Sequence, residues 1–212
     1  VVMWETDRPA PSGVYVRNAS QTDWTQFYDP AQVRMHEITV TGVLPEQRYE
    51  YKVASSGAES PIYSFRTGFG IPFRLGVWGD SRTSPANHRR VISGMIQWSP
   101  DIAVNVGDVV ASGGNYAEWQ AQHFSPIQPL GGNVTTYIAI GNHEGNSHWF
   151  DDYVCQPGNE HFFAFTYANC RFIVLDTNWP YGPGSPQYEW LLRELSSDEC
   201  SLCTFRFAFF HH

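Results

Sequence analysis

The segment Tyr137-Ile138-Ala139-Ile140-Gly141-Asn142-His143-Glu144 joins an apolar run to a polar tetrapeptide, and much of the fold can be predicted from it. The apolar half is typical of a buried strand, and the glycine after it marks the end of that strand. Average residue usage gives this tetrapeptide by chance in about one protein per thousand of this length. An amide, an imidazole and a carboxylate thus stand together at one strand end.

Three other apolar runs end in comparable residues. Phe73–Trp78 is followed by Gly79-Asp80, Ile102–Val106 by Gly107-Asp108, and Phe205–Phe210 by His211 and His212. A single Gly-Asp pair means little, because it is also a common turn. The ordered set is informative, since the carboxyl ends of parallel strands meet at one edge of a sheet. Oxygen and imidazole ligands of this kind hold pairs of hydrolytic metal ions.

The bulk composition bounds the class of protein. The chain has 212 residues, 42% of them hydrophobic and 16% aromatic, which suits one large or two small packed domains. Its net charge of -8 argues against a nucleic-acid groove built on a basic patch. No apolar run approaches the roughly 18 residues that a membrane-spanning helix needs.

Residues 1–67 are predicted to be all-β. Short β-favouring runs alternate with clusters of Pro, Gly, Asp and Ser, and they cover Val1–Trp4, Gly13–Arg17, Met35–Val40, Tyr49–Ala54 and Tyr63–Arg66. Leu44-Pro45 followed by Tyr49 resembles the tyrosine corner of fibronectin-type sandwiches, although two ordinary strand tyrosines (Tyr49 and Tyr51) would give the same pattern. Thr67–Pro72 is predicted to be a short linker.

From Phe73 onward, strands alternate with helices. After the strand at 73–78 we expect a helix near 85–98, with Ser84 as its N-cap and Pro85 as its first residue. The further expected elements are a strand at 102–106, a helix near 115–124, a strand at 137–140 followed by a long loop, strands at 162–167 and 171–175, a helix at 185–195 and a strand at 205–210. This alternation predicts a largely parallel sheet with helices on its faces.

The ordered motifs resemble those of the calcineurin-like metallophosphoesterases, and among them the purple acid phosphatase-like proteins, over nearly the whole chain. The resemblance implies a fibronectin type III-like β-sandwich at residues 1–67. It implies a four-layer αββα metallophosphoesterase domain at residues 73–212, with its C-terminal part missing. Because the chain begins at Val1 inside a strand-like run and stops at His212, we expect a fragment that is open at both ends.

The resemblance also implies a ligand set for two metal ions. Asp108 matches the carboxylate that bridges both metals, and Asp80 matches a ligand of one of them. Asn142 and His211 match ligands of the other metal, with His212 as the alternative histidine. His143 matches a residue that faces the leaving group and stabilises or protonates it. Glu144 is expected to orient His143 or to support the ligands from behind, or else to be a simple turn carboxylate.

Three departures from the family pattern stand out. Ala111 replaces the tyrosine whose phenolate binds ferric iron, so the metals are left open among Fe, Zn and Mn. Arg82 stands where relatives often carry Gly or His, and it is expected to contact the substrate phosphate or to pair with a surface acid. The last family motif, Gly-His-x-His, does not occur, so the chain alone is expected to be inactive.

The implied function is metal-dependent, acid phosphatase-like hydrolysis of phosphate esters, in which a metal-activated hydroxide attacks a small phosphorylated substrate. Phosphodiesters or nucleotides are alternative substrates. A different class remains open, namely a non-catalytic adhesion or carbohydrate-binding protein with a relic phosphatase fold. Asn178-Trp179-Pro180-Tyr181 is expected to be a packed loop, or else an aromatic lip over the substrate.

The even number of cysteines favours an oxidising compartment, and with the resemblance it predicts a secreted or periplasmic protein. Cys200-Ser201-Leu202-Cys203 is a lone CxxC, expected to hold a structural disulfide or free thiols. The histidines outside the motifs are expected to be exposed or satisfied in the core; they are His36, His88, His123, His148 and His161.

Overall fold

The computed structural model describes residues 1–68, 70–145 and 147–212, and the chain divides into two compact units. The first unit contains Val1–Phe69 and Gly132–Val134, and the second contains Gly70–Gly131 and Thr135–His212. The division falls inside the Thr67–Pro72 segment. The short segment 132–134 groups with the first unit because Tyr51 donates its hydroxyl to the Gly132 carbonyl and Ser64 N–H donates to Asn133.

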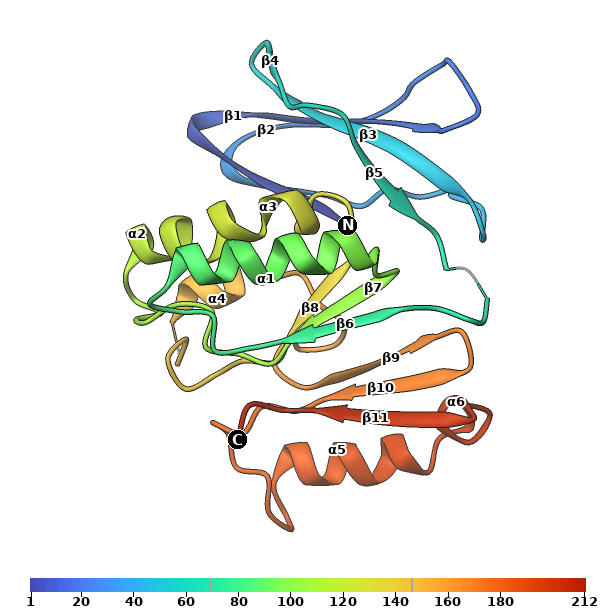
Figure 1. The fold of residues 1–212 in the computed structure, drawn as a ribbon, viewed down its shortest axis with the longest axis vertical. Coiled ribbons are helices and arrows are strands. Elements are labelled where there is room, and N and C mark those ends of the chain that lie inside the picture. Colours follow the sequence, from blue (N-terminus) through green and yellow to red (C-terminus); the bar gives the residue numbers. More distant parts are fainter. Residues whose placement is uncertain (69, 146) are drawn as a thin grey trace. The chain divides into compact units, whose positions relative to one another are not determined.

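The first unit is one antiparallel sheet of five strands (Figure 1). The strands are β1 (Val2–Asn18), β2 (Thr25–Ile38), β3 (Arg48–Ser55), β4 (Ala58–Glu59) and β5 (Tyr63–Arg66). Their order is β2-β1-β3-β4, and β5 also pairs with β3. Because all five belong to one hydrogen-bonded sheet, a division into the two sheets of a fibronectin-like sandwich stays a prediction.

Alternating inward side chains build the core of this unit. Val14, Val16, Ile38 and Tyr49 are buried together, as period-2 alternation along strands requires. The Tyr49 hydroxyl accepts a hydrogen bond from Leu44 N–H at 2.9 Å. The predicted return of a buried tyrosine hydroxyl to the preceding chain is therefore confirmed.

Strand β1 differs from the prediction of two separate strands at Val1–Trp4 and Gly13–Arg17. It runs through both, with register shifts against β2 between Glu5 and Ala10 and between Ala10 and Ser12. Proline and glycine at 9–13 suggested a break, but irregular pairing of this kind accommodates them within one long strand. Strand β2 likewise begins at Thr25, ten residues before the predicted Met35.

The second unit contains two three-stranded sheets. The parallel sheet β6-β7-β8 consists of Leu75–Trp78, Ile102–Asn105 and Thr136–Ile138. The mixed sheet β11-β10-β9 consists of Phe205–Phe209, Cys170–Val174 and Phe163–Tyr167, with β11 parallel and β9 antiparallel to β10. The helices are α1 (Pro85–Trp98), α2 (Tyr116–Glu118), η1 (Trp119–Phe124), α3 (Ser125–Gly131), α4 (His148–Tyr153), α5 (Pro186–Leu195) and α6 (Asp198–Ser201).

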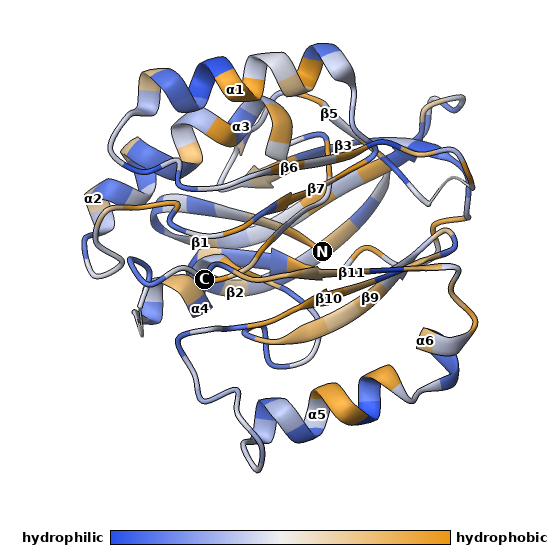
Figure 2. Cartoon of the chain, turned by 60° about the horizontal axis from the view of Figure 1, so that its bottom comes forward, coloured by the Kyte–Doolittle hydropathy of each residue, from blue (hydrophilic) through white to orange (hydrophobic). Residues whose placement is uncertain are grey.

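The two sheets of this unit pack on each other through apolar inner faces. Ala139, which follows β8, forms a buried cluster with Phe163 and Val174 of the mixed sheet, and Tyr137 of β8 packs against it. Helices α1 and α3 lie on the outer side of the parallel sheet, and α5 lies on the outer side of the mixed sheet (Figures 1 and 2). Ser84 and Pro85 begin α1 at the predicted positions. Among the described residues, no helix is both long and apolar enough to cross a bilayer.

The helical segment predicted at 115–124 continues to Gly131. A π-helical stretch, η1, joins α2 to α3, so Pro126 and Pro129 lie within a helix that extends past the predicted end at residue 124. The loop predicted after residue 140 contains α4, which begins at the cap Ser147, whose hydroxyl accepts from Trp149 N–H. Both segments were missed because they are too short for a clear hydrophobic period.

The two cysteines of the CxxC motif are not joined by a disulfide. Cys200 and Cys203 are buried thiols, and Arg206 Nε donates to Cys200 Sγ at 3.2 Å. Of the two expectations for this CxxC, the structure has free thiols. The secreted or periplasmic location stays a prediction.

Candidate metal centre

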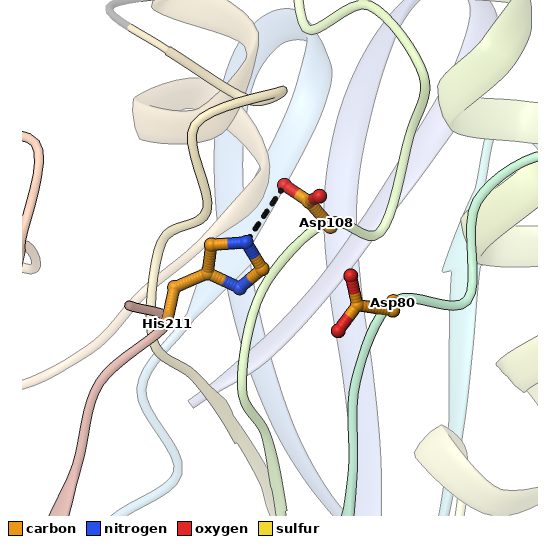
Figure 3. A group of neighbouring side chains, drawn as sticks. All are labelled: Asp80, Asp108 and His211. Carbon is orange, nitrogen blue, oxygen red and sulfur yellow. Dashed lines mark ion pairs between the residues drawn. The ribbon is translucent and has the colours of Figure 1, made fainter.

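Three of the predicted ligands come together at one edge of the second unit. Donor atoms of Asp80, Asp108 and His211 all lie within 4.8 Å of one another (Figure 3). They follow β6, β7 and β11, so strand ends from both sheets contribute to the cluster. Asp108 is 2% exposed, whereas the Asp80 side chain is 68% exposed, so the cluster has a buried side and an open side.

Tight backbone packing sets the positions of the two aspartates. Asp80 N–H donates to the Gly107 carbonyl at 2.9 Å. A Cβ at Gly107 would lie 2.7 Å from Gly141 N, and the φ of Gly107 is +93°, so only glycine suits this position. Asp80 and Asp108 also have positive φ, of 51° and 58°. The glycines of the Gly-Asp pairs thus let three strand ends approach closely, while the aspartates take up a left-handed conformation.

His211 is oriented by a backbone carbonyl. Its Nδ1 lies 2.7 Å from the Val106 carbonyl oxygen, which can only accept, so Nδ1 carries the proton. In the neutral ring, the lone pair is then on Nε2, which lies 3.4 Å from Asp108 Oδ1. Two acceptors that face each other fit a cation bound by both. The donor set of two carboxylates and one oriented imidazole therefore suits Zn, Fe or Mn.

Glu144 holds the second and third motifs together. Its carboxylate is 1% exposed and accepts four backbone N–H groups, those of Asp108 and Gly141 at 2.8 Å, Val109 at 2.8 Å and Val110 at 3.1 Å. Burial raises the pKa of Glu144, and the backbone donors oppose this shift. The side chain contacts the Asp108 backbone directly, which places it behind the candidate ligands.

A different group orients His143. Its Nδ1 lies 2.6 Å from the Ala111 carbonyl, so Nδ1 donates and Nε2 is left with the lone pair in the neutral ring. Its backbone N–H donates to Asp108 Oδ1 at 3.1 Å. Ala111, the position that departs from the family pattern, thus anchors His143 through its main chain. Asn142 is exposed beside it, and its role as a ligand stays a prediction.

Arg82 forms ion pairs with the candidate ligands Asp80 and Asp108 and not with a distant surface acid. One nitrogen of its guanidinium, Nη1, contacts the Asp108 carboxylate and lies 3.2 Å from Asp80 Oδ1. Its backbone N–H donates to the Asp108 carbonyl at 3.1 Å. A positive charge thus balances the two carboxylates, and its role toward a phosphate stays a prediction.

Thr177 was missed from the sequence, whereas its partner His212 and the neighbouring Asn178 had been singled out. His212 turns to Thr177, whose Oγ1 accepts its backbone N–H at 3.3 Å, so His211 is the histidine that faces Asp108. Asn178 Nδ2 donates to the Gly141 carbonyl at 3.2 Å. The signal that could have pointed to these contacts is Asp176, a further acid at a strand end.

Known proteins are similar to this chain in sequence and in fold. Purple acid phosphatase 15 of Arabidopsis thaliana is 26% identical over 219 residues, which is 84% of this chain and 41% of that protein. Probable inactive purple acid phosphatase 27 of the same plant is 25% identical over 46% of this chain and 19% of its own length. The structure of purple acid phosphatase PPD1 from yellow lupin (Lupinus luteus) matches with a TM-score of 0.79 at 16% identity, over 97% of this chain and 47% of that chain.

The chain thus spans less than half the length of each of these three relatives. A model of the calcineurin-like phosphoesterase family matches residues 74–195, more than half of the chain. That range contains Asp80, Asp108 and the Gly141–Glu144 tetrapeptide at the strand ends described above, and His211 lies beyond it. The chain belongs to the calcineurin-like phosphoesterase family.

Proposed function

We propose that the protein hydrolyses phosphate esters at a centre of two metal ions, in the manner of an acid phosphatase, on a four-layer αββα domain at residues 73–212. One observation carries the proposal, namely the approach of Asp80, Asp108 and His211 to within 4.8 Å of one another, with the His211 ring oriented by a carbonyl. A neutral imidazole whose lone pair faces a carboxylate does not stabilise that carboxylate by itself, whereas both groups can bind the same cation.

Each residue has a task in this proposal. Asp108 would help to hold both ions, Asp80 would help to hold one of them, and Asn142 and His211 would help to hold the other. Glu144 keeps the Asp108 loop against the Gly141 loop by its four backbone contacts. Metal ions held there would supply an acidified water as the nucleophile and positive charge for the phosphoryl group.

His143 and Arg82 act on the substrate. Because Ala111 holds Nδ1 of His143, Nε2 is the nitrogen that can carry a proton to the leaving oxygen. The guanidinium of Arg82 pairs bidentately with phosphate oxygens as readily as with carboxylates. It is 26% exposed at the mouth of the cluster, within reach of an entering anion.

Asp108→Asn in the full-length protein tests the proposal. The substitution keeps the shape of the side chain but removes the charge between the ions, so we expect loss of bound metal and at least about a hundredfold loss of kcat. Metal content is measured by atomic emission, and turnover with 4-nitrophenyl phosphate. Asp152→Asn, an exposed acid on α4, is the matched control and should change neither value. Turnover that persists after complete metal removal would contradict the proposal.

The substrate class has two further candidates. Comparing 4-nitrophenyl phosphate with its bis-ester separates a monoesterase from a phosphodiesterase or nucleotidase. One matched relative is named probable inactive, which supports a non-catalytic binding protein as the second candidate function. Glycan binding by the protein together with no hydrolysis of any ester would favour that candidate.

A further inference from the structure

The loop after β10 forms hydrogen bonds with two segments, one next to Asn142 and one next to His211, which are the candidate ligands of one metal ion. Asn178 Nδ2 donates to the carbonyl of Gly141, the residue before Asn142. Thr177 Oγ1 accepts from the backbone of His212, the residue after His211. Trp179 follows Asn178 directly, so its main chain is one residue away from the residue that contacts Gly141.

A histidine held between two carboxylates supports the Trp179 ring. His161 Nδ1 lies 3.0 Å from Asp176 Oδ2, and its Nε2 lies 3.0 Å from Asp151 Oδ1. Ionised carboxylates only accept, so both ring nitrogens donate and the imidazole is a cation. The hydrogen bond to Asp176, which is fully buried, is the main cause that raises the pKa of His161.

The indole stacks on this imidazole. The two ring centroids are 4.8 Å apart and the rings are 18° from parallel, and Phe162 touches the indole with its centroid at 6.0 Å. A cation against one face of an indole is favourable, so the ring is held without being covered. Trp179 is still 37% exposed. An indole that only filled a core would be covered like Trp119, which is 0% exposed.

We propose that Trp179 is a specificity residue of this site, whose exposed ring stacks on an aromatic leaving group of a phosphate ester, such as an aryl group or a nucleoside. His161, Asp151 and Asp176 are positioning residues that hold the ring in place. The inference rests on the proposed hydrolysis of phosphate esters and adds its substrate class. Aromatic side chains bind bases and aryl rings by such stacking, whereas a small alkyl group gains little from it.

The test compares phenyl phosphate with ethyl phosphate in steady-state kinetics of the full-length protein supplied with Mn²⁺. Trp179→Ala should raise the KM for phenyl phosphate about tenfold and leave kcat within about twofold. Both constants for ethyl phosphate should stay within about twofold. Trp179→Phe keeps an aromatic face and should recover most of the lost affinity. Trp98→Ala, which removes an exposed indole at the end of α1, is the matched control and should behave as the wild type.

His161→Ala tests whether His161 positions the Trp179 ring, as distinct from the contact that the ring itself makes with the substrate. Without the imidazole the indole is free to turn, so the KM for phenyl phosphate should rise by about threefold while ethyl phosphate is again unaffected. Equal losses on both substrates in the Trp179 variants, or no change on either, would overturn the inference while leaving the hydrolase proposal intact. If the wild type hydrolyses neither ester with any metal, the proposed function fails, and the aromatic specificity fails with it.

Discussion

Arg82 occupies the lone pairs that a metal ion at Asp80 and Asp108 would need. Its guanidinium contacts both carboxylates, and Asp108 is almost fully buried, so this pair is poorly screened by water. A bound cation and the guanidinium therefore compete for the same oxygens. We expect metal binding to displace Arg82, and under the proposed function its charge would then be available for a substrate phosphate.

Arg82→Ala should consequently strengthen metal binding. Loss of the competing charge is expected to lower the apparent Kd for Mn²⁺ about fivefold, equivalent to about 1 kcal/mol. The KM for 4-nitrophenyl phosphate should rise in the same variant, because a phosphate contact is lost. Calorimetric titration with Mn²⁺ measures the first effect, and Arg89→Ala, which removes an exposed contact to Ser125, is the control. Unchanged or weaker metal binding would show that Arg82 does not compete.

The sequence indicates which residues form the cluster better than it indicates what holds them. Asp80, Asp108 and His211 could be predicted because each follows an apolar strand, and parallel strands bring their carboxyl ends to one edge. The hydrogen bonds from four N–H groups to Glu144 could not be predicted, because three of these groups belong to a loop more than thirty residues away in the chain. The same holds for the carbonyls of Val106 and Ala111, because main-chain acceptors leave no mark on residue identity.

At the scale of elements, His161 connects helix α4 to the strand end after β10. Asp151 lies on α4 and Asp176 follows β10, so the protonated imidazole joins two elements that share no backbone pairing. Folding raises the pKa of His161 above its ordinary value of 6.5. The folded state thus binds the proton more tightly than the unfolded state does. The resulting stabilisation is full below pH 6.5 and is lost as the pH rises through the folded pKa.

His161→Asn should therefore cost more stability in acid than in base. At pH 5.5 we expect the free energy of unfolding to fall by about 2 kcal/mol, and at pH 9 the two proteins should differ by clearly less. Urea denaturation at both pH values gives the comparison. His148→Asn removes an exposed histidine paired with Asp152 on the same helix and serves as the control. A difference between the proteins that grows with pH would mean that His161 is neutral in the folded state.

Elements with a clear hydrophobic period were predicted well, and those governed by local chemistry were not. Strand β5 was predicted with its observed ends, Tyr63 and Arg66, and α5 began within one residue of the prediction. Strand β1 was predicted as two separate strands, and the helix that continues through η1 and α3 was predicted to end at residue 124. Proline lowers the propensity for a strand or a helix, but an irregular pairing or a π-helical stretch can absorb it when tertiary packing favours continuation.

At the scale of the whole molecule, the two units differ in how their polar and charged groups are stabilised. The first unit is a sheet with an apolar core, and its buried polar groups, such as His36 between Ser12 and Thr6, are paired within it. The second unit places Asp80 and Asp108 together at strand ends, where only the Arg82 guanidinium offsets their charge among the described contacts. A metal ion should therefore stabilise the second unit and leave the first unchanged.

Hydrogen exchange of the full-length protein with and without Mn²⁺ can resolve this difference along the chain. At a metal concentration of about 100 times Kd, binding stabilises the folded state by about 2.7 kcal/mol, which slows exchange that requires opening of the site up to about a hundredfold. We expect this protection at 79–82, 107–110 and 141–144, whose N–H groups bind across the cluster. Amides of β1 and β3 should exchange at the same rate in both conditions.

In Asp108→Asn the protection should disappear, because the bridging charge is gone. Equal protection of both units would mean that Mn²⁺ acts as a general stabiliser, and protection that survives in Asp108→Asn would place the metal elsewhere.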